Sequence, residues 1–250
     1  MPANAPYSTY RKTAVVVGLL FVVCTAASVL SAVATSGLFD APQYLATLSA
    51  HEGRMVGGAL IEFVWAISAA GIAIGFYPVL RKHNRALALG SVAARLVEGV
   101  LILVGMLGLL TLLSVSEKAA AGTDAVAGSL LAARDWTHGF VMVLAWLAGA
   151  FMYYYLLYRA RLIPRWLSGW GLAAASLCLV ATIYSGFTQE FGFTTVNTVL
   201  NIPIGVQEMV LAVWLIAKGF SPAALASGRT ATPEKNSKTP FAEPIPYQAN

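Results

Sequence analysis

Three ionisable side chains capable of acid–base or ion-binding chemistry lie within long apolar stretches of the sequence, namely Arg95, Glu98 and Glu208. An ionisable group at membrane depth costs at least about 2.5–3.5 kcal/mol on insertion scales, so each requires a partner or a function. One guanidinium and two carboxylates leave a surplus negative charge, and in a low dielectric one glutamate is expected to hold a proton. These residues predict a buried site that binds or translocates a small solute or a proton.

The depth of two of these residues predicts an ion pair between helices. Arg95 lies ten residues after Arg85, and Glu208 lies ten residues before Lys218. At a rise of about 1.5 Å per residue, both would lie about 15 Å from the same membrane surface. Equal depth and opposite charge predict an Arg95–Glu208 pair, and Glu98 shares the helix face of Arg95 because it follows at the i+3 position.

A second group of polar residues is expected nearer the opposite membrane surface. Counted from the basic residues at the cytoplasmic ends of their segments, Glu62, His138 and Asn201 fall about 25–32 Å from the cytoplasmic surface. With Asp135 and Tyr184, they are expected to line a wet vestibule that opens outward. The interface is partly hydrated, so a purely structural role for Asp135 and His138 is the alternative.

The segments that must position these residues are transmembrane helices. Hydrophobic residues make up 58% of the 250 residues and charged residues 11%, whereas a typical globular chain has about 45–50% and about 25%. This composition excludes a water-soluble enzyme and a disordered protein. We therefore predict an all-α, polytopic bundle of six transmembrane helices, because six stretches reach the length of about 20 residues that a span needs: 13–35, 56–80, 87–114, 137–158, 166–187 and 195–217.

The distribution of basic residues predicts the orientation of the bundle. If the six segments alternate, twelve of the 16 Lys and Arg residues lie on one side, three lie on the other, and Arg95 lies within a span. The positive-inside rule then places both termini in the cytoplasm, in a multi-pass protein of a bacterial inner membrane. The first segment carries the cleavage-like pattern Ala32-Val33-Ala34, and cleavage there would leave five spans. Its apolar run is longer than the apolar core of a signal peptide, which has about 7–15 residues, and this favours an uncleaved first span.

The domain organisation follows from these spans. Residues 1–12 are predicted to be a cytoplasmic N-terminus, residues 13–220 the membrane domain, and the polar, proline-containing residues 221–250 a disordered cytoplasmic tail. Residues 36–54 and 115–135 are predicted linkers, the first with a short helix at the outer interface.

Several chemistries are not indicated by any pattern in the sequence. No catalytic nucleophile, metal-ligand spacing, dinucleotide loop or phosphate loop is present, so we expect no catalytic residue of those classes, no metal and no cofactor. The basic residues lie beside apolar runs without an aromatic platform, which argues against a nucleic-acid partner. Gly71 and Gly75 form a GxxxG pattern, which fits either close helix packing or a homo-oligomer.

Several motifs of this chain resemble a bacterial membrane family catalogued as domain of unknown function 4386. The resemblance covers about residues 10–220 and implies a polytopic membrane protein without an assigned activity or catalytic residues. The motifs that carry it are Tyr77-Pro78-Val79-Leu80-Arg81, Arg95-Leu96-Val97-Glu98, Ala132-Ala133-Arg134-Asp135-Trp136, Pro203, Gln207-Glu208-Met209, Trp214 and Lys218-Gly219-Phe220.

Three functional interpretations stay open at this point. The leading one is a protein that binds or translocates a small solute or a proton through Arg95 and the two glutamates near it in depth. The second is an intramembrane enzyme that acts on a lipid or quinone, with Glu62, Asp135 and His138 as acid–base groups. The third is a structural or accessory membrane protein whose buried charges only hold the helices together.

Overall fold

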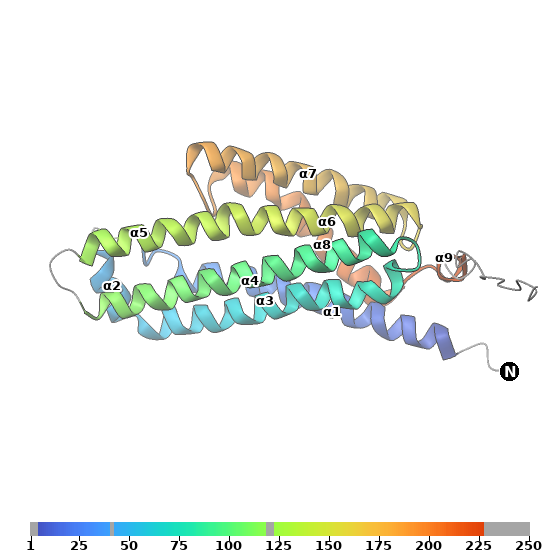
Figure 1. Ribbon diagram of the computed structural model, residues 1–250, viewed down its shortest axis with the longest axis horizontal. Coiled ribbons are helices and arrows are strands. Elements are labelled where there is room, and N and C mark those ends of the chain that lie inside the picture. Colours follow the sequence, from blue (N-terminus) through green and yellow to red (C-terminus); the bar gives the residue numbers. More distant parts are fainter. Residues whose placement is uncertain (1–4, 41–42, 119–122, 228–250) are drawn as a thin grey trace, which may run out of the picture.

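A computed structural model of the chain describes residues 5–40, 43–118 and 123–227 (Figure 1). The described residues are almost entirely helical and contain no β-strand. The helices are α1 (Ala5–Thr35), α2 (Tyr44–Ala50), α3 (Glu52–Leu80), α4 (Arg85–Ser116), α5 (Thr123–Trp136), η1 (Thr137–Val141), α6 (Met142–Arg159), α7 (Arg165–Thr188), α8 (Thr195–Ala217) and α9 (Pro222–Ser227).

Six helical segments are long and apolar enough to cross a membrane, and they confirm the predicted all-α, six-span bundle. Each carries its backbone hydrogen bonds within the segment, which is what the hydrocarbon core requires. The shortest, α8, has 23 residues, which corresponds to about 35 Å of helix and exceeds the hydrocarbon thickness of about 30 Å.

The fourth span differs from the prediction. The sequence placed it at 137–158 and assigned 115–135 to a linker, but one continuous helix of 37 residues runs from Thr123 to Arg159. Polar residues in α5 end the apolar run without ending the helix, because helix continuity depends on backbone hydrogen bonds and not on hydropathy. The predicted short helix in the first linker is present as α2.

The two ends of the chain also differ in detail from the predicted boundaries. Helix α1 begins at Ala5, ahead of the predicted span start at residue 13. At the other end, α9 occupies Pro222–Ser227, within the segment predicted to be a disordered tail. The rest of that predicted tail, residues 228–250, lies outside the described residues.

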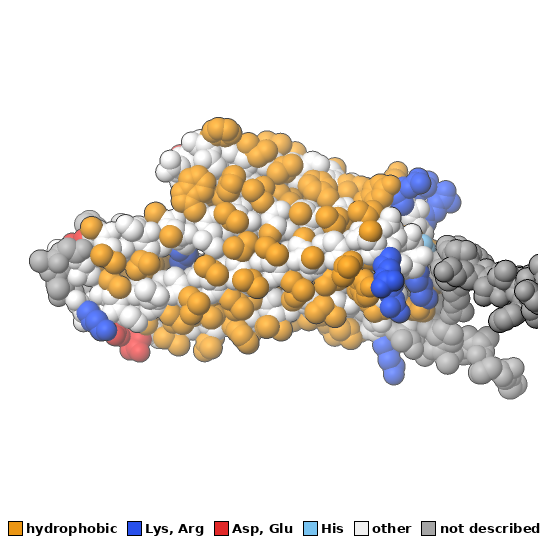
Figure 2. Space-filling model, in the orientation of Figure 1, with side chains coloured by type: hydrophobic (Ala, Val, Ile, Leu, Met, Phe, Trp, Pro, Cys, Tyr) orange, Lys and Arg blue, Asp and Glu red, His pale blue; other side chains and the backbone are white. Residues whose placement is uncertain are grey.

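The spanning helices form a closed ring in chain order. Helix α1 packs against α3, α3 against α4, α4 against α6, α6 against α7, α7 against α8, and α8 returns to α1. The start of α1 and α9 lie at the same end of the bundle (Figure 1). The same end carries a concentration of Lys and Arg side chains (Figure 2). We call this the basic end and the opposite one the outer end, a name that denotes only its position in the bundle.

The long helices α4 and α5–α6 extend beyond α7 and α8 at the outer end (Figure 1). A separate apolar core stabilises this extension and includes Leu45 and Leu48 of α2 together with residues of α3, α4 and α5. The larger core lies inside the ring itself and includes residues of all six spans.

Two arginines stabilise exposed helix C-termini and help to close the ring. Arg11 of α1 donates from Nη1 to Leu215 O at 2.9 Å and from Nη2 to Ile216 O at 2.5 Å, at the end of α8. Arg54 of α3 donates to Ala34 O and to Ser36 O, both at 3.0 Å, at the end of α1. The last carbonyls of a helix have no partner within it and carry partial negative charge, so a guanidinium satisfies both needs.

Candidate functional site

Arg95 lies in the interior of the ring and is 1% exposed. Its Nη1 is 2.9 Å from Oε2 of Glu98 in the same helix and donates to Oε1 of that carboxylate at 3.2 Å. Its Nε donates to Ala69 O of α3 at 3.3 Å. The guanidinium therefore points into the protein and not toward lipid, as a buried charge requires.

The close approach of α4 and α6 makes room for this arginine. A Cβ atom at Gly149 of α6 would lie 3.0 Å from Cγ and 3.2 Å from Cδ of Arg95. The Ser91 hydroxyl donates to the Gly149 carbonyl at 3.2 Å and fixes the two helices at that level. A larger residue at position 149 would force the aliphatic part of the arginine side chain out of its place.

Glu208 of α8 lies in the same region but has a different direct partner from the predicted one. Thr25 of α1 donates from Oγ1 to Oε2 of Glu208 at 3.2 Å. Among the described residues, Arg95 and Glu208 do not form an ion pair within 4.0 Å, although they interact electrostatically. The predicted Arg95–Glu208 pair is therefore corrected to Arg95–Glu98. A residue count gives the depth of a side chain in the membrane but not its direction around the helix. Glu98 follows Arg95 at the i+3 position, so the two side chains lie on the same helix face and within direct reach of each other. We call Arg95, Glu98 and Glu208 the central cluster.

A buried hydrogen-bonded pair beside the central cluster was missed by the sequence analysis. Tyr154 of α6 donates to Oε1 of Gln207 at 2.5 Å, and Gln207 donates from Nε2 to Leu167 O at 3.1 Å. Both side chains are completely buried, which links α6, α7 and α8 at one level. The available signal was Gln207 beside Glu208 in an apolar helix, since a buried amide needs partners.

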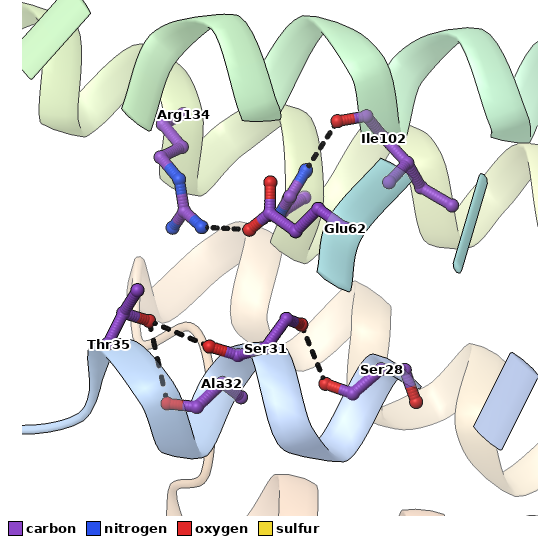
Figure 3. Close-up of polar contacts among 8 residues, drawn as sticks. Ser28, Ser31, Ala32, Thr35, Glu62, Ile102 and Arg134 are labelled. Atoms are coloured by element: carbon purple, nitrogen blue, oxygen red, sulfur yellow. Dashed lines mark hydrogen bonds and ion pairs between the residues drawn. The ribbon is translucent and has the colours of Figure 1, made fainter. Parts of the chain in front are cut away.

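The second group of buried charges lies toward the outer end, where α5 is located (Figure 1). Figure 3 shows contacts of this group. Arg134 of α5 donates from Nη2 to Oε1 of Glu62 in α3 at 2.5 Å. Nδ1 of His138 is 4.0 Å from the same Oε1, and its Nε2 is 3.3 Å from Ile102 O of α4. We call Glu62, Arg134 and His138 the outer cluster. The structure thus brings together two predicted residues, Glu62 and His138, and adds Arg134, which lies one helical turn before the histidine.

The backbone around His138 departs from a regular α-helix. Residues Thr137–Val141 form a π-helical turn, in which the N–H of Met142 donates to Thr137 O. The helix approaches α4 closely here, because a Cβ atom at Gly105 would overlap the His138 imidazole. Single π-helical turns within α-helices occur often at functional sites, where they redirect side chains.

The other predicted vestibule residues do not join the outer cluster. Asp135 is half-buried and interacts electrostatically with the adjacent Arg134. Tyr184 is 38% exposed on α7, so it faces the surroundings of the bundle and not its interior. Asn201 is half-buried, and its buried Oδ1 has no hydrogen-bond partner in the described part of the chain.

A stripe of hydroxyl residues on α1 lies between the two clusters. Three of its hydroxyls donate to carbonyls of α1. Ser28 donates to Thr25 O at 2.9 Å, and Figure 3 shows the bonds from Ser31 to Ser28 O at 2.9 Å and from Thr35 to Ser31 O at 3.1 Å. One end of the stripe reaches Glu208 through Thr25. At the other end, the methyl group of Thr35 would lie 3.0 Å from a Cβ atom at Gly58, one turn before Glu62. We call Thr25, Ser28, Ser31 and Thr35 the hydroxyl stripe.

The described residues include no group of three or more His, Cys, Asp or Glu side chains arranged to hold a metal ion. The cysteines of α1 and α7, Cys24 and Cys178, are both buried and free. The described polar groups are carboxylates, an imidazole and hydroxyls, which can perform acid–base and ion-binding chemistry.

Comparison with known proteins gives a family but no activity. The family model described as Domain of unknown function (DUF4386) matches residues 16–219. Neither the curated proteins nor the solved structures that were compared with the chain give a match. The matched region contains most of the first span, all of the other five, both charged clusters and the hydroxyl stripe. The chain belongs to the family described as domain of unknown function 4386.

Proposed function

We propose that this integral membrane protein binds and translocates a proton, or a small solute that carries one, through the interior of the helix ring. The central cluster is the proposed binding site, with Arg95 as a fixed positive charge and Glu98 and Glu208 as the exchanging carboxylates. The observation that carries the proposal is an imbalance of charge inside the helix ring: the buried Arg95 and Glu98 lie near a second, half-buried carboxylate, that of Glu208.

A purely structural cluster would not need the second carboxylate. Arg95 and Glu98 already form a complete pair with an additional bond to the Ala69 carbonyl. In the described part of the chain, the side chain of Glu208 accepts one hydrogen bond, and its donor is the neutral hydroxyl of Thr25. Glu208 is half-buried within a span and has no ion-pair partner within 4.0 Å among the described residues, so its charged form carries a desolvation cost that binding a proton or a cation would remove. This supports an exchange function for Glu208.

The hydroxyl stripe supports a route between Glu208 and the outer side. A hydroxyl both donates and accepts, so a chain of hydroxyls and intervening water can pass a proton by reorientation. The stripe begins at Thr25, which contacts Glu208, and ends where Thr35 packs beside the helix that carries Glu62. We propose it as the outward half of the path, with the outer cluster at its entrance.

The proposal is tested by proton flux into liposomes that contain the purified protein, an internal pH-sensitive dye and a membrane potential set by potassium and valinomycin. We expect flux above that of protein-free liposomes, loss of that flux in Glu208→Gln, and a smaller decrease in Thr25→Val. The matched control is Glu190→Gln, the same substitution at an exposed residue in a loop. Wild-type flux in Glu208→Gln would overturn the proposal. Unchanged elution and helicity of each variant establish that it is folded.

The outer cluster favours a second candidate, an intramembrane enzyme acting on a lipid or quinone. General acid–base chemistry needs two groups within reach of one substrate, and Nδ1 of His138 is 4.0 Å from Oε1 of Glu62. The other carboxylate oxygen, Oε2, is buried without a hydrogen-bond partner among the described residues. Mass spectrometry of lipids and quinones co-purified with the protein tests this candidate, and His138→Gln should lose any specifically retained species. Equal retention by wild type and variant would contradict it.

We further propose that the protein resides in a bacterial inner membrane with both termini in the cytoplasm. The concentration of basic side chains at one end supports this orientation (Figure 2), because cytoplasmic loops of inner-membrane proteins are enriched in Lys and Arg.

A further inference from the structure

A cavity of about 610 Å³ opens at the basic end, where the α6–α7 loop meets the segment between α8 and α9. Its apolar floor consists of Leu162, Ile163 and Phe220, which are all buried. The Ser221 N–H donates to Leu162 O at 2.8 Å and holds the two walls together. The cavity is separate from both charged clusters, so an inference from it does not depend on the proposed proton path, although it rests on the proposed orientation in the membrane.

Three basic side chains line this cavity: Arg161, Arg165 and Lys218. Within the described part of the chain, none of them forms an ion pair within 4.0 Å. Arg165 lies over the ring of Tyr158, with its Cζ 5.4 Å from the ring centroid. It is also the first residue of α7, where unpaired backbone N–H groups and the helix dipole favour an anion. The cavity thus combines a concentrated positive charge with an apolar base.

The backbone at Arg161 is held in a conformation that an arginine rarely adopts. Its φ is +52°, in the left-handed region. The turn ends α6 with two bonds, from Leu162 N–H to Leu157 O at 3.2 Å and from Arg161 N–H to Tyr158 O at 3.4 Å. Glycine is the usual residue at this position of such a turn. An arginine kept there despite the backbone strain suggests that its side chain has a function at the cavity.

Aromatic residues place the cavity at the level of the lipid headgroups. Trp214 lines it, and Trp166 and Trp170 lie in the first turns of α7 next to Arg165. Tryptophan and tyrosine are enriched at the boundary between hydrocarbon and water, and basic pockets at the cytoplasmic ends of membrane helices bind anionic headgroups. We propose that this cavity binds the phosphate headgroup of an anionic phospholipid, with Arg161, Arg165 and Lys218 contacting the phosphate and the apolar floor contacting the glycerol and upper acyl chain.

The experiment measures binding of phosphatidylglycerol to the full-length protein in phosphatidylcholine nanodiscs or by native mass spectrometry. The pocket variant is Arg161→Gln/Arg165→Gln/Lys218→Gln, and the matched control is Arg81→Gln/Lys82→Gln/Arg85→Gln, which removes the same charge from the same end outside the cavity. Each basic residue near a membrane surface contributes about fivefold to anionic-lipid affinity, so the pocket variant should bind about a hundredfold more weakly.

The control variant should retain phosphatidylglycerol binding close to that of the wild type. Equal loss in the two variants would overturn the proposal, because it would show attraction by the whole basic end and not by the cavity. A second arm replaces the lipid by inorganic phosphate or glycerol phosphate at the same concentration. If either saturates the site as well as phosphatidylglycerol does, the ligand is a free phosphate and the assignment to a lipid is wrong. The melting temperature of each variant in phosphatidylcholine alone shows that it is folded.

Discussion

Arg134 of α5 and Glu62 of α3 form an ion pair between two helices that are not neighbours in the ring, with Nη2 2.5 Å from Oε1. Helix α4 lies between α3 and the α5–α6 helix in the ring order. His138 extends the connection, because its Nε2 lies 3.3 Å from the Ile102 carbonyl of α4. The outer cluster therefore joins three helices at one level. Its charges are fully paired, in contrast to the surplus carboxylate of the central cluster.

The first prediction concerns the stability of this pair. Removal of one partner from a buried ion pair leaves an unpaired charge and costs about 3–5 kcal/mol, whereas removal of both is much less costly. Arg134→Gln and Glu62→Gln should therefore each lower the melting temperature of the detergent-solubilised protein, and the double variant should recover part of the loss. Arg85→Gln, at an exposed residue, is the control. Strictly additive losses would show that the two side chains do not interact in the membrane domain.

The second prediction concerns the space that Gly105 provides for the imidazole. A Cβ atom at this position would overlap His138, so Gly105→Ala should destabilise the protein by about 1–3 kcal/mol. Gly128→Ala is the matched control, because a Cβ atom there meets nothing within 4 Å. It should raise stability by about 0.5–1 kcal/mol, since glycine costs more backbone entropy in a helix. Replacement of the histidine by alanine in the Gly105→Ala protein should restore stability, and absence of that rescue would contradict the proposed overlap.

The number and type of the spanning helices could be predicted from the sequence because apolar run length directly reflects the thickness of hydrocarbon. The continuous helix through Arg134 and Asp135 could not, because hydropathy averages do not show that a charged residue is neutralised by a distant partner such as Glu62. The π-helical turn at Thr137–Val141 had no sequence signal either. It depends on how this helix packs against α4 beside Gly105.

The candidate site shows the same division between what the sequence determines and what packing determines. The sequence identified Arg95, Glu98 and Glu208 as buried because charges are rare in apolar runs. It assigned the wrong partner to Arg95, since residue counts give the depth of a side chain but not its direction around the helix. Tyr154 is completely buried against Gln207, although nothing in the sequence distinguishes it from the neighbouring Tyr153 and Tyr155. Whether a tyrosine at this end of α6 faces the interior or the lipid depends on how α6 is rotated about its axis within the ring.

The third prediction concerns the closure of the ring at the basic end. Arg11 donates to Leu215 O at 2.9 Å and to Ile216 O at 2.5 Å, so Arg11→Gln should leave the α8 C-terminus without its charged donor. A hydrogen bond to a charged group contributes about 1.5–3 kcal/mol, and we expect a loss in that range in thermal unfolding. Lys12→Gln removes the same charge from the adjacent, exposed position and should have little effect. Equal effects of the two substitutions would indicate simple surface electrostatics.

The fourth prediction concerns pH and the loop between α3 and α4. Burial, and secondly the charge of Lys82, lower the pKa of His83 below its ordinary value, which is about 6.5. The unfolded chain then binds this proton more readily than the folded protein does, so the stabilising contribution is complete above about pH 6.5 and is lost as the pH falls through the lowered pKa. The melting temperature of the wild type should decrease from pH 7.5 to pH 5 more than that of His83→Asn. An identical decrease in both proteins would exclude His83 as a source of the pH dependence.

The fifth prediction concerns the orientation in the membrane. Both natural cysteines are buried, so their replacement by alanine gives a background in which a single introduced cysteine reports its side of the membrane. Lys12 lies near the start of α1 at the basic end, whereas Glu117 is exposed just beyond the end of α4 at the outer end. If the basic end is cytoplasmic, an impermeant maleimide should label Glu117→Cys in intact cells and Lys12→Cys only after the cells are permeabilised. The reverse pattern would place the surplus carboxylate of Glu208 closer to the outer solution, and the hydroxyl stripe would then lead toward the cytoplasm.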